Sequence, residues 1–453
     1  MKDFLSGKKK VHFIGCGGSG MLPLEQILLA KGFELSGSDN NDTATFRLAE
    51  ANGVKVMLGH SAENVNGAEL VVYSAAIAES NVELIAARSL NIEVRERSEL
   101  LGLVSSWYQH ALCVCGTHGK TTATSMLTQI LLADGADPSA VIGGKLPAVH
   151  GYGKSGNGDS IVIEACEFKD TFLRLSPTLS IVLNIDNDHL DYFGNMENLI
   201  TSFSRFVGMT RDAVLYNGDD VNTVKAVEQS GFAGKRVTFG FADTNDYYAT
   251  NIEYIAPFET KFTLIGKAEC IGDVTIRVPG THNVLNAVAS AAAALLRGTK
   301  FSSICEGLNA FNGVGRRFER KGTLNGAVVV DDYAHHPTEV AATLNAAKTM
   351  GFKRVIVIHQ PFTYSRTNEL MNEFAEALSL ADKVLLTDIM GGREANAWGV
   401  TADMLAAKIV GAEMLGDFVR VADRARELAS DGDLIITMGC GDVYKVSDML
   451  IAK

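Results

Sequence analysis

The sequence is poor in proline, in positive charge and in long apolar segments. Its 453 residues include 8 prolines against 44 glycines, a balance that indicates the many tight strand-to-helix turns of an α/β fold. Lys and Arg number 41 against 53 Asp and Glu, and the resulting net charge of −12 argues against a nucleic-acid partner. The apolar run after Lys8-Lys9-Lys10 stops at Gly15, which is too short for a signal peptide or a membrane span, so we expect no membrane partner.

Cysteine pairs with the spacing of a redox or zinc motif are also absent. The 7 cysteines are scattered, and Cys113 and Cys115 are one residue apart, which suits neither a CxxC pair nor a zinc knuckle. We therefore expect reduced thiols in a cytoplasmic protein. The chain length predicts about three domains of ~150 residues each, and a hydrophobic fraction of 47% is ample for their cores.

The most informative stretch is a glycine turn that ends in Lys and Thr. The apolar run 111–115 before it is typical of a buried strand, and residues 125–132 after it carry apolar side chains at helical spacing. The glycines would let backbone N–H groups approach phosphate oxygens, and the helix N-terminus adds positive charge. Lys120 would neutralise the β/γ oxygens, and the Thr121 hydroxyl would hold magnesium. The pattern predicts a nucleotide site, although Val114 stands at the upstream glycine position of a full Walker A motif.

A second glycine loop follows the first predicted strand, residues 11–14. It spans residues 15–21 and precedes a helix and a second strand, 33–37, which leads into Ser38 and Asp39. This order resembles a dinucleotide-binding fold, in which the acidic residue holds a ribose hydroxyl. The alternative is a tight turn of an α/β sheet without a ligand. Residues 1–108 should form one nucleotide-binding unit.

Polar clusters follow two predicted strands after the phosphate loop. Strand 161–163 leads into Glu164-Ala165-Cys166-Glu167, and strand 179–183 leads into residues 184–191. Ligands of open α/β sheets bind beyond the carboxyl ends of strands. Glu164 suits magnesium, or it caps the next helix. His189 is a less expected magnesium ligand, because imidazole prefers softer metals. The alternative is that His189 forms hydrogen bonds at the end of the strand.

The sequence from residue 235 onward predicts a group of antiparallel strands followed by a third α/β unit. Segments within 235–278 are rich in aromatic and β-branched residues and are interpreted as antiparallel strands. Asn283 and Asn286 would share a helix face and present amides to an adenine edge, or Asn283 is a cap. Gly313 and Gly315 are candidate hinges before Arg316, and strands 327–330, 355–358, 384–386 and 434–438 alternate with helices. The turn 439–442 has a structural role first, and a ligand role as the alternative.

The order of these motifs resembles the Mur ligases, and among them the members that attach the first amino acid, L-alanine, to UDP-N-acetylmuramate in peptidoglycan synthesis. The resemblance covers nearly the whole chain and also includes Gly315-Arg316-Arg317-Phe318 and the segment from Asp331 to Pro337. It implies an α/β fold with three domains: an N-terminal Rossmann-like domain (1–108), a central P-loop ATPase-type mixed sheet (109–314) and a C-terminal Rossmann-like domain (315–453).

The resemblance also implies ligands and site residues. The expected substrates are UDP-N-acetylmuramate and L-alanine, with ATP and Mg²⁺ as cofactors, in a monomer or a dimer. The expected catalytic residues are Lys120, Glu164, His189 and Arg316, and the expected metal ligands are Thr121, Glu164 and His189. The residues expected to bind ATP are Gly116, Thr117, His118, Gly119, Lys120, Thr121, Thr122, Asn283, Asn286, Arg316 and Asp332. Those expected to bind the UDP substrate are Gly15, Gly17, Gly18, Ser19, Gly20, Met21, Ser38 and Asp39, and those expected to bind the amino acid are Tyr333, His335 and Arg366.

One segment departs from the family pattern. The family often has histidine after Gln-Pro, whereas this chain has Phe362, so the imidazole that the family places in the segment for alanine is absent here. Arg366 is present and can form a bidentate pair with a carboxylate. Two other functions stay open: a ligase of the same fold that joins a preformed peptide in wall recycling, and a non-catalytic nucleotide-binding homologue. The N-terminal glycine loop argues against a third, the joining of glutamate to a folate.

Overall fold

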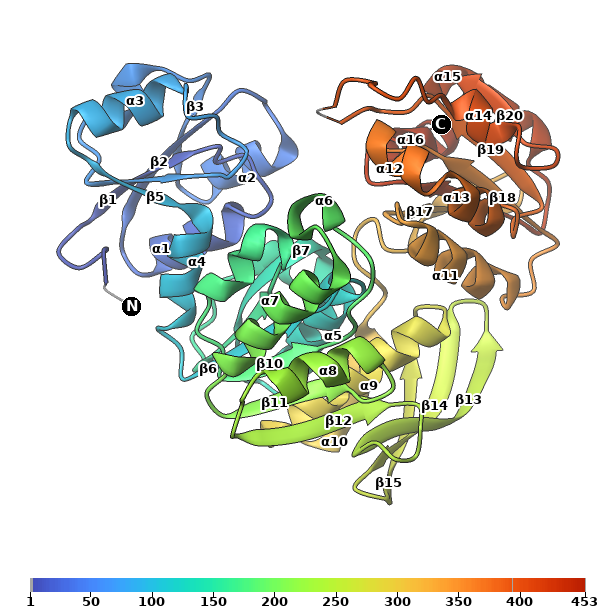
Figure 1. Ribbon diagram of the computed structural model, residues 1–453, viewed down its shortest axis with the longest axis horizontal. Coiled ribbons are helices and arrows are strands. Elements are labelled where there is room, and N and C mark those ends of the chain that lie inside the picture. Colours follow the sequence, from blue (N-terminus) through green and yellow to red (C-terminus); the bar gives the residue numbers. More distant parts are fainter. Residues whose placement is uncertain (1–2, 393, 453) are drawn as a thin grey trace. The chain divides into compact units, whose positions relative to one another are not determined.

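The structure is a computed structural model that describes residues 3–392 and 394–452 (Figure 1). Its internal contacts divide the chain into two compact units. Unit 1 comprises Met1–Thr250, Leu264–Gly272 and Leu285–Leu308, and unit 2 comprises Asn251–Thr263, Asp273–Val284 and Asn309–Lys453.

The first sheet, in unit 1, is parallel throughout. Its strands are β1 (Lys10–Ile14), β2 (Glu34–Asp39), β3 (Lys55–Leu58), β4 (Leu70–Tyr73) and β5 (Glu93–Glu96), in the order β3-β2-β1-β4-β5. Its helices are α1 (Leu22–Ala30), α2 (Ala44–Ala51), α3 (Val82–Ser89) and α4 (Arg97–Ser105). Val11 and Phe13 pack with α1 and α4, whereas Ile14 packs with α3 on the other face. The strand order reverses between β1 and β4, which places a ligand-binding crevice beyond their carboxyl ends.

The second sheet has ten strands, with β6 near its middle. The strands are β6 (His110–Cys115), β7 (Ser139–Leu146), β8 (Gly151–Lys154), β9 (Ser160–Glu164), β10 (Leu179–Val182), β11 (Ala213–Asn217), β12 (Lys235–Gly240), β13 (Tyr247–Ala256), β14 (Glu259–Gly266) and β15 (Glu269–Ile276). Their order is β15-β14-β13-β12-β11-β10-β6-β9-β7-β8, and the boundary between the two units passes through β13 to β15. The helices of this region are α5 (Lys120–Ala133), α6 (Leu190–Phe193), α7 (Met196–Gly208), α8 (Val221–Gln229), α9 (Thr281–Leu296) and α10 (Phe301–Ala310).

Two features of this sheet differ from the prediction. We expected antiparallel strands from residue 235 onward, but β12 and β13 pair in parallel, with Phe239 opposite Tyr247. Aromatic and β-branched residues predict strands without fixing their direction, and so this part of the prediction was wrong. The antiparallel hairpin of β7 and β8 was not predicted, and it adds the β8 edge to the sheet.

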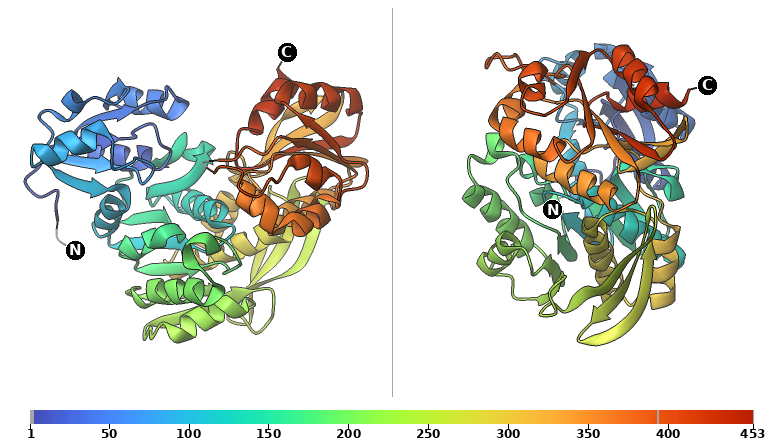
Figure 2. Two further views of the ribbon diagram at one scale, coloured as in Figure 1. Left: turned by 45° about the horizontal axis from the view of Figure 1, so that its top comes forward. Right: turned by 90° about the vertical axis from the view of Figure 1, so that its right-hand side faces the viewer.

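The third sheet, in unit 2, is parallel except for one edge strand. Its strands are β16 (Glu319–Leu324), β17 (Ala327–Asp332), β18 (Arg354–His359), β19 (Lys383–Thr387), β20 (Glu413–Gly416) and β21 (Asp433–Met438), in the order β16-β17-β21-β18-β19-β20, with β16 antiparallel. Its helices are α11 (Pro337–Lys348), α12 (Tyr364–Glu369), α13 (Met371–Leu378), α14 (Ala402–Ala406), α15 (Phe418–Leu428) and α16 (Tyr444–Ile451). They cover both faces (Figure 2). Val355 and Val357 pack with α11 and α13, whereas Ile356 and Ile358 pack with α15 and α16.

These three sheets confirm the predicted α/β class and three-part organisation. Short polar side chains begin several helices; for example, Asn81 accepts hydrogen bonds from the backbone of α3, and Asp417 accepts one from that of α15. Among the described residues, no helix combines the length and the apolar character that a membrane crossing requires.

Candidate active site

The predicted phosphate loop joins β6 to α5, and its backbone explains both glycines. Gly116 has φ of 142° and Gly119 has φ of 83°, conformations that side-chain-bearing residues rarely adopt. A Cβ atom at Gly119 would also lie 2.6 Å from Asn286 Oδ1. The local pattern of strand, left-handed glycine and helix therefore places the N-terminus of α5 at the open end of the loop.

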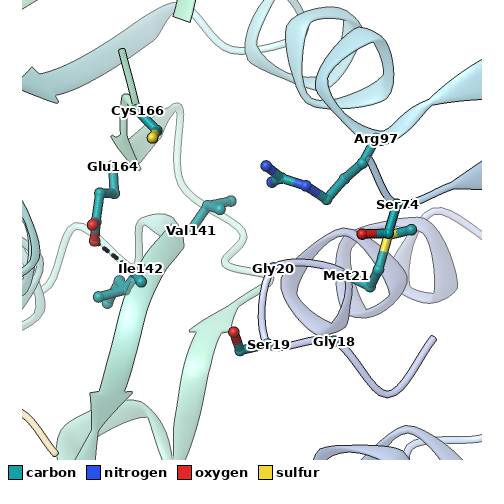
Figure 3. Close-up of a pocket in the computed structure, with 11 residues that line it drawn as sticks. Gly18, Ser19, Gly20, Met21, Ser74, Arg97, Val141, Ile142, Glu164 and Cys166 are labelled. Carbon is teal, nitrogen blue, oxygen red and sulfur yellow. Dashed lines mark hydrogen bonds between the residues drawn. The ribbon is translucent and has the colours of Figure 1, made fainter. Parts of the chain in front are cut away.

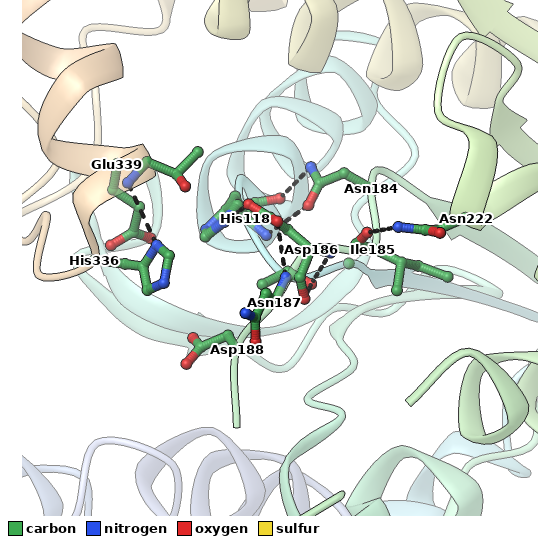
Figure 4. A network of polar contacts seen from close by, with 12 residues as sticks. His118, Asn184, Ile185, Asp186, Asn187, Asp188, Asn222, His336 and Glu339 are labelled. Atoms are coloured by element: carbon green, nitrogen blue, oxygen red, sulfur yellow. Dashed lines mark hydrogen bonds and ion pairs between the residues drawn. The ribbon is translucent and has the colours of Figure 1, made fainter. Parts of the chain in front are cut away.

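A second segment, residues 184–186, fixes the shape of this loop (Figure 4). Asn184 Oδ1 accepts a hydrogen bond from the His118 backbone N–H at 2.8 Å, and its Nδ2 donates to the His118 carbonyl at 3.0 Å. The Asp186 backbone N–H donates to Thr117 Oγ1 at 2.9 Å, and the Asp186 carboxylate lies 3.1 Å from His118 Nε2. The loop is thus held by the segment that follows β10, and Asn184 and Asp186 are site residues to which the sequence assigned no role.

The Lys120 side chain folds back over its own loop. Its Nζ donates to the carbonyls of Gly116 at 2.5 Å and Thr117 at 3.0 Å, and to Glu167 Oε1 at 2.9 Å. Burial is the largest single influence and would lower the pKa of Lys120, but the charge and hydrogen bond of Glu167, together with the charges of Cys166 and Glu164, raise this pKa above its ordinary value. Glu167 is only 1% exposed, and its second oxygen has no hydrogen-bond partner among the described residues. It is the principal residue of this site that sequence reasoning did not assign.

Thr121 and Glu164 meet as the prediction of a shared cation requires. Thr121 Oγ1 donates to Glu164 Oε1 at 2.8 Å, and the Gly143 backbone N–H on β7 donates to Glu164 Oε2 at 2.6 Å. A Cβ atom at Gly143 would lie 2.6 Å from the same carboxylate, so a side chain there would displace it from this position. Both oxygens of Glu164 are hydrogen-bonded to protein groups that orient them.

His189 lies beside Glu167 rather than Glu164. Its Nε2 is 3.9 Å from Glu167 Oε1, and its ring centroid is 4.9 Å from that of Phe168. Among the side chains that the structure describes, which exclude those of residues 190 and 191, no three His, Cys, Asp or Glu form a group that could hold a metal ion. The three predicted ligands therefore divide into a Thr121–Glu164 pair and His189.

The N-terminal glycine loop lines a cavity of about 350 Å³ that reaches Glu164 (Figure 3). The N-terminal glycine loop and Glu164 both belong to unit 1. The lining residues are Gly18, Ser19, Gly20, Met21, Ser74, Arg97, Val141, Ile142, Gly143, Glu164 and Cys166. The cavity lies beyond the carboxyl ends of β1 and β4, where the strand order reverses. Arg97 and Ser74 were not predicted, although their positions after β5 and β4 place them at this edge of the sheet.

Ser38 and Asp39 at the end of β2, and Gly15 of the loop, form contacts within the first sheet and its loop. Asp39 Oδ2 accepts from the Gly17 backbone N–H at 3.1 Å. Ser38 is fully buried, and its hydroxyl donates to Glu83 at 2.5 Å. Gly15 has φ of 84°, and its N–H donates to the Ser38 carbonyl at 2.8 Å. These contacts hold β2 against the loop and shape the loop for the cavity.

The two asparagines of α9 are both buried. Asn286 reaches the phosphate loop at Gly119, as described above. Asn283 Nδ2 donates to the Pro279 carbonyl at 2.6 Å, so this amide helps to fix the start of the helix.

In unit 2, Arg316 is held at the carboxyl ends of β17 and β21. Its Nε lies 3.2 Å from Asp331 Oδ2, and its Nη2 donates to the Gly439 carbonyl at 2.6 Å. The guanidinium carbon is 4.9 Å from the ring centre of Tyr333 and 4.8 Å from that of Tyr444. The turn at Gly439 therefore has a structural role toward Arg316.

Asp332 and His335 are likewise bound within unit 2. The Asp332 carboxylate accepts from the backbone N–H groups of Phe318 at 2.7 Å and Ala334 at 2.8 Å, and burial raises its pKa to about 6. His335 Nδ1 is 3.1 Å from Glu339 Oε2, which gives this histidine an acidic partner. Arg366 lies on α12, which Thr363 caps.

Family models match three consecutive parts of the chain. Residues 10–108 match the Mur ligase family catalytic domain, residues 114–294 the Mur ligase middle domain, and residues 316–441 the Mur ligase glutamate ligase domain. Similar curated proteins include the UDP-N-acetylmuramate–L-alanine ligases of Agathobacter rectalis, 41% identical with 98% of each chain covered, and of Acetivibrio thermocellus, 41% identical with 98% of this chain and 96% of the relative covered.

Solved structures with this fold include two ligases. UDP-N-acetylmuramate-alanine ligase from Thermotoga maritima is similar with a TM-score of 0.83 and 27% identity, with 98% of each chain covered. A murein peptide ligase from Psychrobacter arcticus is similar with a TM-score of 0.73 and 25% identity, again with 98% of each chain covered.

Proposed function

The chain belongs to the Mur ligase family, and we propose that it joins L-alanine to UDP-N-acetylmuramate, with ATP as co-substrate, in peptidoglycan precursor synthesis. One observation carries the proposal. The Glu164 carboxylate contacts Thr121 of the phosphate loop at 2.8 Å and also lines the cavity of the N-terminal glycine loop. ATP on the phosphate loop and a UDP-linked substrate on the N-terminal glycine loop would therefore meet at Glu164.

The proposed reaction has two steps. The muramoyl carboxylate attacks the γ-phosphorus of ATP, the bond to the β-phosphate oxygen breaks, and an acyl phosphate and ADP result. The uncharged amine of L-alanine then attacks the acyl carbon, and the tetrahedral intermediate expels phosphate. Lys120 exchanges its loop carbonyls for phosphate oxygens, which offsets the repulsion between the carboxylate and the triphosphate. Positioning and charge, rather than a protein nucleophile, supply the acceleration.

Magnesium fits the Thr121–Glu164 pair. Both side chains offer hard oxygen donors, and Gly143 orients the carboxylate from behind. Bound there, the ion would supply positive charge that offsets the charge of the triphosphate. His189 is the candidate for a further cation, with Glu167 beside it.

The other predicted residues keep their proposed roles. Residues 116–122 with Asn283, Asn286, Arg316 and Asp332 serve ATP. The loop 15–21 with Ser38 and Asp39 serves the UDP substrate, and Tyr333, His335 and Arg366 serve the amino acid. The proposed domains remain 1–108, 109–314 and 315–453, in accord with the ranges of the family matches. We further propose a cytoplasmic monomer or dimer; the 7 free cysteines are consistent with a reducing compartment.

Phosphate release tests the proposal and separates it from its rival. The purified chain is supplied with ATP, Mg²⁺ and UDP-N-acetylmuramate, and then with L-alanine, L-serine, glycine or the wall tripeptide in turn. We expect phosphate release and a ligated product by mass spectrometry with a single amino acid. Turnover only with the tripeptide would identify a recycling ligase, and no turnover with any acceptor would refute ligation.

A further inference from the structure

One cation in the cavity has no counter-ion. Arg97 is the first residue of α4, and its guanidinium projects into the cavity from the side of the first sheet (Figure 3). In the part of the chain that the structure describes, its side chain makes no hydrogen bond or ion pair. The charge is therefore available to a ligand.

The neighbouring arginine, Arg95, is paired with acidic residues, in contrast to Arg97. Arg95 donates to Glu93 at 2.5 Å and to Glu99 at 3.1 Å, so its charge is already paired within the protein. Burying part of a guanidinium in a cavity without a partner costs free energy, and an anion bound in the cavity would offset that cost.

The surroundings of Arg97 select an anion on the glycine loop. A Cβ atom at Gly20 would lie 3.3 Å from Arg97 Nη1, so the guanidinium lies directly against this loop. Ser19 and Ser74 add hydroxyl groups to the cavity lining. A guanidinium presents paired N–H donors that match two oxygens of one phosphate. Glu164, the acid of the cavity, lines its other side (Figure 3).

We infer that Arg97 binds the β-phosphate of the nucleotide-sugar substrate and holds it against the glycine loop. The inference rests on the proposed function, because it assumes that a UDP-linked substrate enters this cavity. The phosphate is favoured over the muramoyl carboxylate for a positional reason. That carboxylate must reach the γ-phosphate of ATP, which the proposed function places beside Glu164, whereas Arg97 lies at Gly20.

A ladder of ligands tests the inference without any catalysis. The affinities of UMP, UDP, UDP-N-acetylglucosamine and UDP-N-acetylmuramate are measured by calorimetry at one salt concentration, with the parent, Arg97→Met, Arg97→Lys and the control Arg95→Met. We expect the parent to bind UDP more tightly than UMP, and Arg97→Met to lose about 10- to 100-fold of that gain, the range for a charge-assisted hydrogen bond. Arg97→Lys should retain part of the gain, and Arg95→Met all of it.

Each other outcome overturns the inference. An unchanged gain from UMP to UDP in both Arg97 variants would show that the β-phosphate does not use this side chain. A loss confined to the step from UDP-N-acetylglucosamine to UDP-N-acetylmuramate would assign Arg97 to the carboxylate instead. If Arg97→Met does not fold, Arg97→Lys decides by the same comparison.

The failure of this inference is distinguishable from that of the proposed function. Phosphate release is measured with the parent chain alone, so a chain that binds UDP through Arg97 but ligates nothing would refute only the function. In an active chain, Arg97→Met should raise the KM for UDP-N-acetylmuramate by about 10- to 100-fold and leave the KM for ATP unchanged.

Discussion

Replacing Lys120 should weaken the fold as well as the reaction. Lys120→Met keeps a similar length of side chain but removes the ammonium that lies 2.9 Å from Glu167 Oε1. The side chain of Glu167 is 1% exposed and that of Lys120 is 14% exposed, so the pair is buried rather than superficial. The substitution leaves a buried carboxylate without its closest cation.

The magnitude follows from this burial. Removing one partner of a buried ion pair typically costs about 3–5 kcal/mol, whereas an exposed pair is worth about 0–1 kcal/mol. At about 2–4 °C per kcal/mol, the melting temperature should fall by roughly 6–20 °C. The double variant Lys120→Met/Glu167→Gln removes both charges, and so it should regain most of this loss without regaining ligation.

The assay is thermal unfolding without nucleotide, combined with phosphate release. Lys225→Met is the matched control, because it breaks an exposed pair with Glu197 whose side chains are 42% and 59% exposed. That control should lose no more than about 1 kcal/mol. Lys120→Met should still bind UDP as the parent does when measured below its melting temperature. Equal melting temperatures for Lys120→Met and the double variant would refute the reasoning, because Glu167 would then not be the cause.

Three further substitutions test the site and the N-terminal helix. Glu164→Gln should raise the magnesium concentration needed for half-maximal rate by about 10-fold or more, and an unchanged magnesium titration would show that Glu164 has only a structural role. Gly143→Ala should have the same effect by displacing that carboxylate, whereas Gly151→Ala, whose Cβ would meet its nearest neighbour at 3.9 Å, should not. Glu25→Gln should stabilise the fold more at pH 8 than at pH 5 by thermal unfolding. Burial raises the pKa of Glu25 well above its ordinary value, so the folded chain retains a proton that the unfolded chain loses above about pH 4, and stability falls as pH rises. An equal gain at both pH values would contradict this assignment.

The phosphate loop was predictable because its determinants are local. A strand, two glycines with positive φ and a helix that begins at Lys120 are contiguous in sequence, and each follows from a rule about neighbouring residues. The placement of Glu164 at the end of β9 was predictable for the same reason, since parallel strands bring their carboxyl ends to one edge.

The partners of these residues were not predictable from local pattern. Glu167 follows β9 by three residues, and the short helix Phe168–Arg174 after it contains two non-glycine residues with positive φ, Lys169 and Asp170, which no propensity forecasts. Gly143 lies in a hairpin whose first strand contains two consecutive glycines, and it reaches Glu164 because β7 pairs with β9. His189 illustrates the same limit, because its segment was identified but its neighbour was not.

The hydrogen bonds between residues 117–118 and residues 184–186 affect the thermodynamics of nucleotide binding. They organise the loop while the chain folds, so a nucleotide meets amides that already point in fixed directions. The entropy of arranging them is lost in folding and is not subtracted again from the affinity. Nucleotide binding by the parent should therefore include little entropy loss from ordering this loop. Truncating the Asn184 side chain should leave the loop less ordered before binding, so that the entropy of ordering it is lost on binding instead.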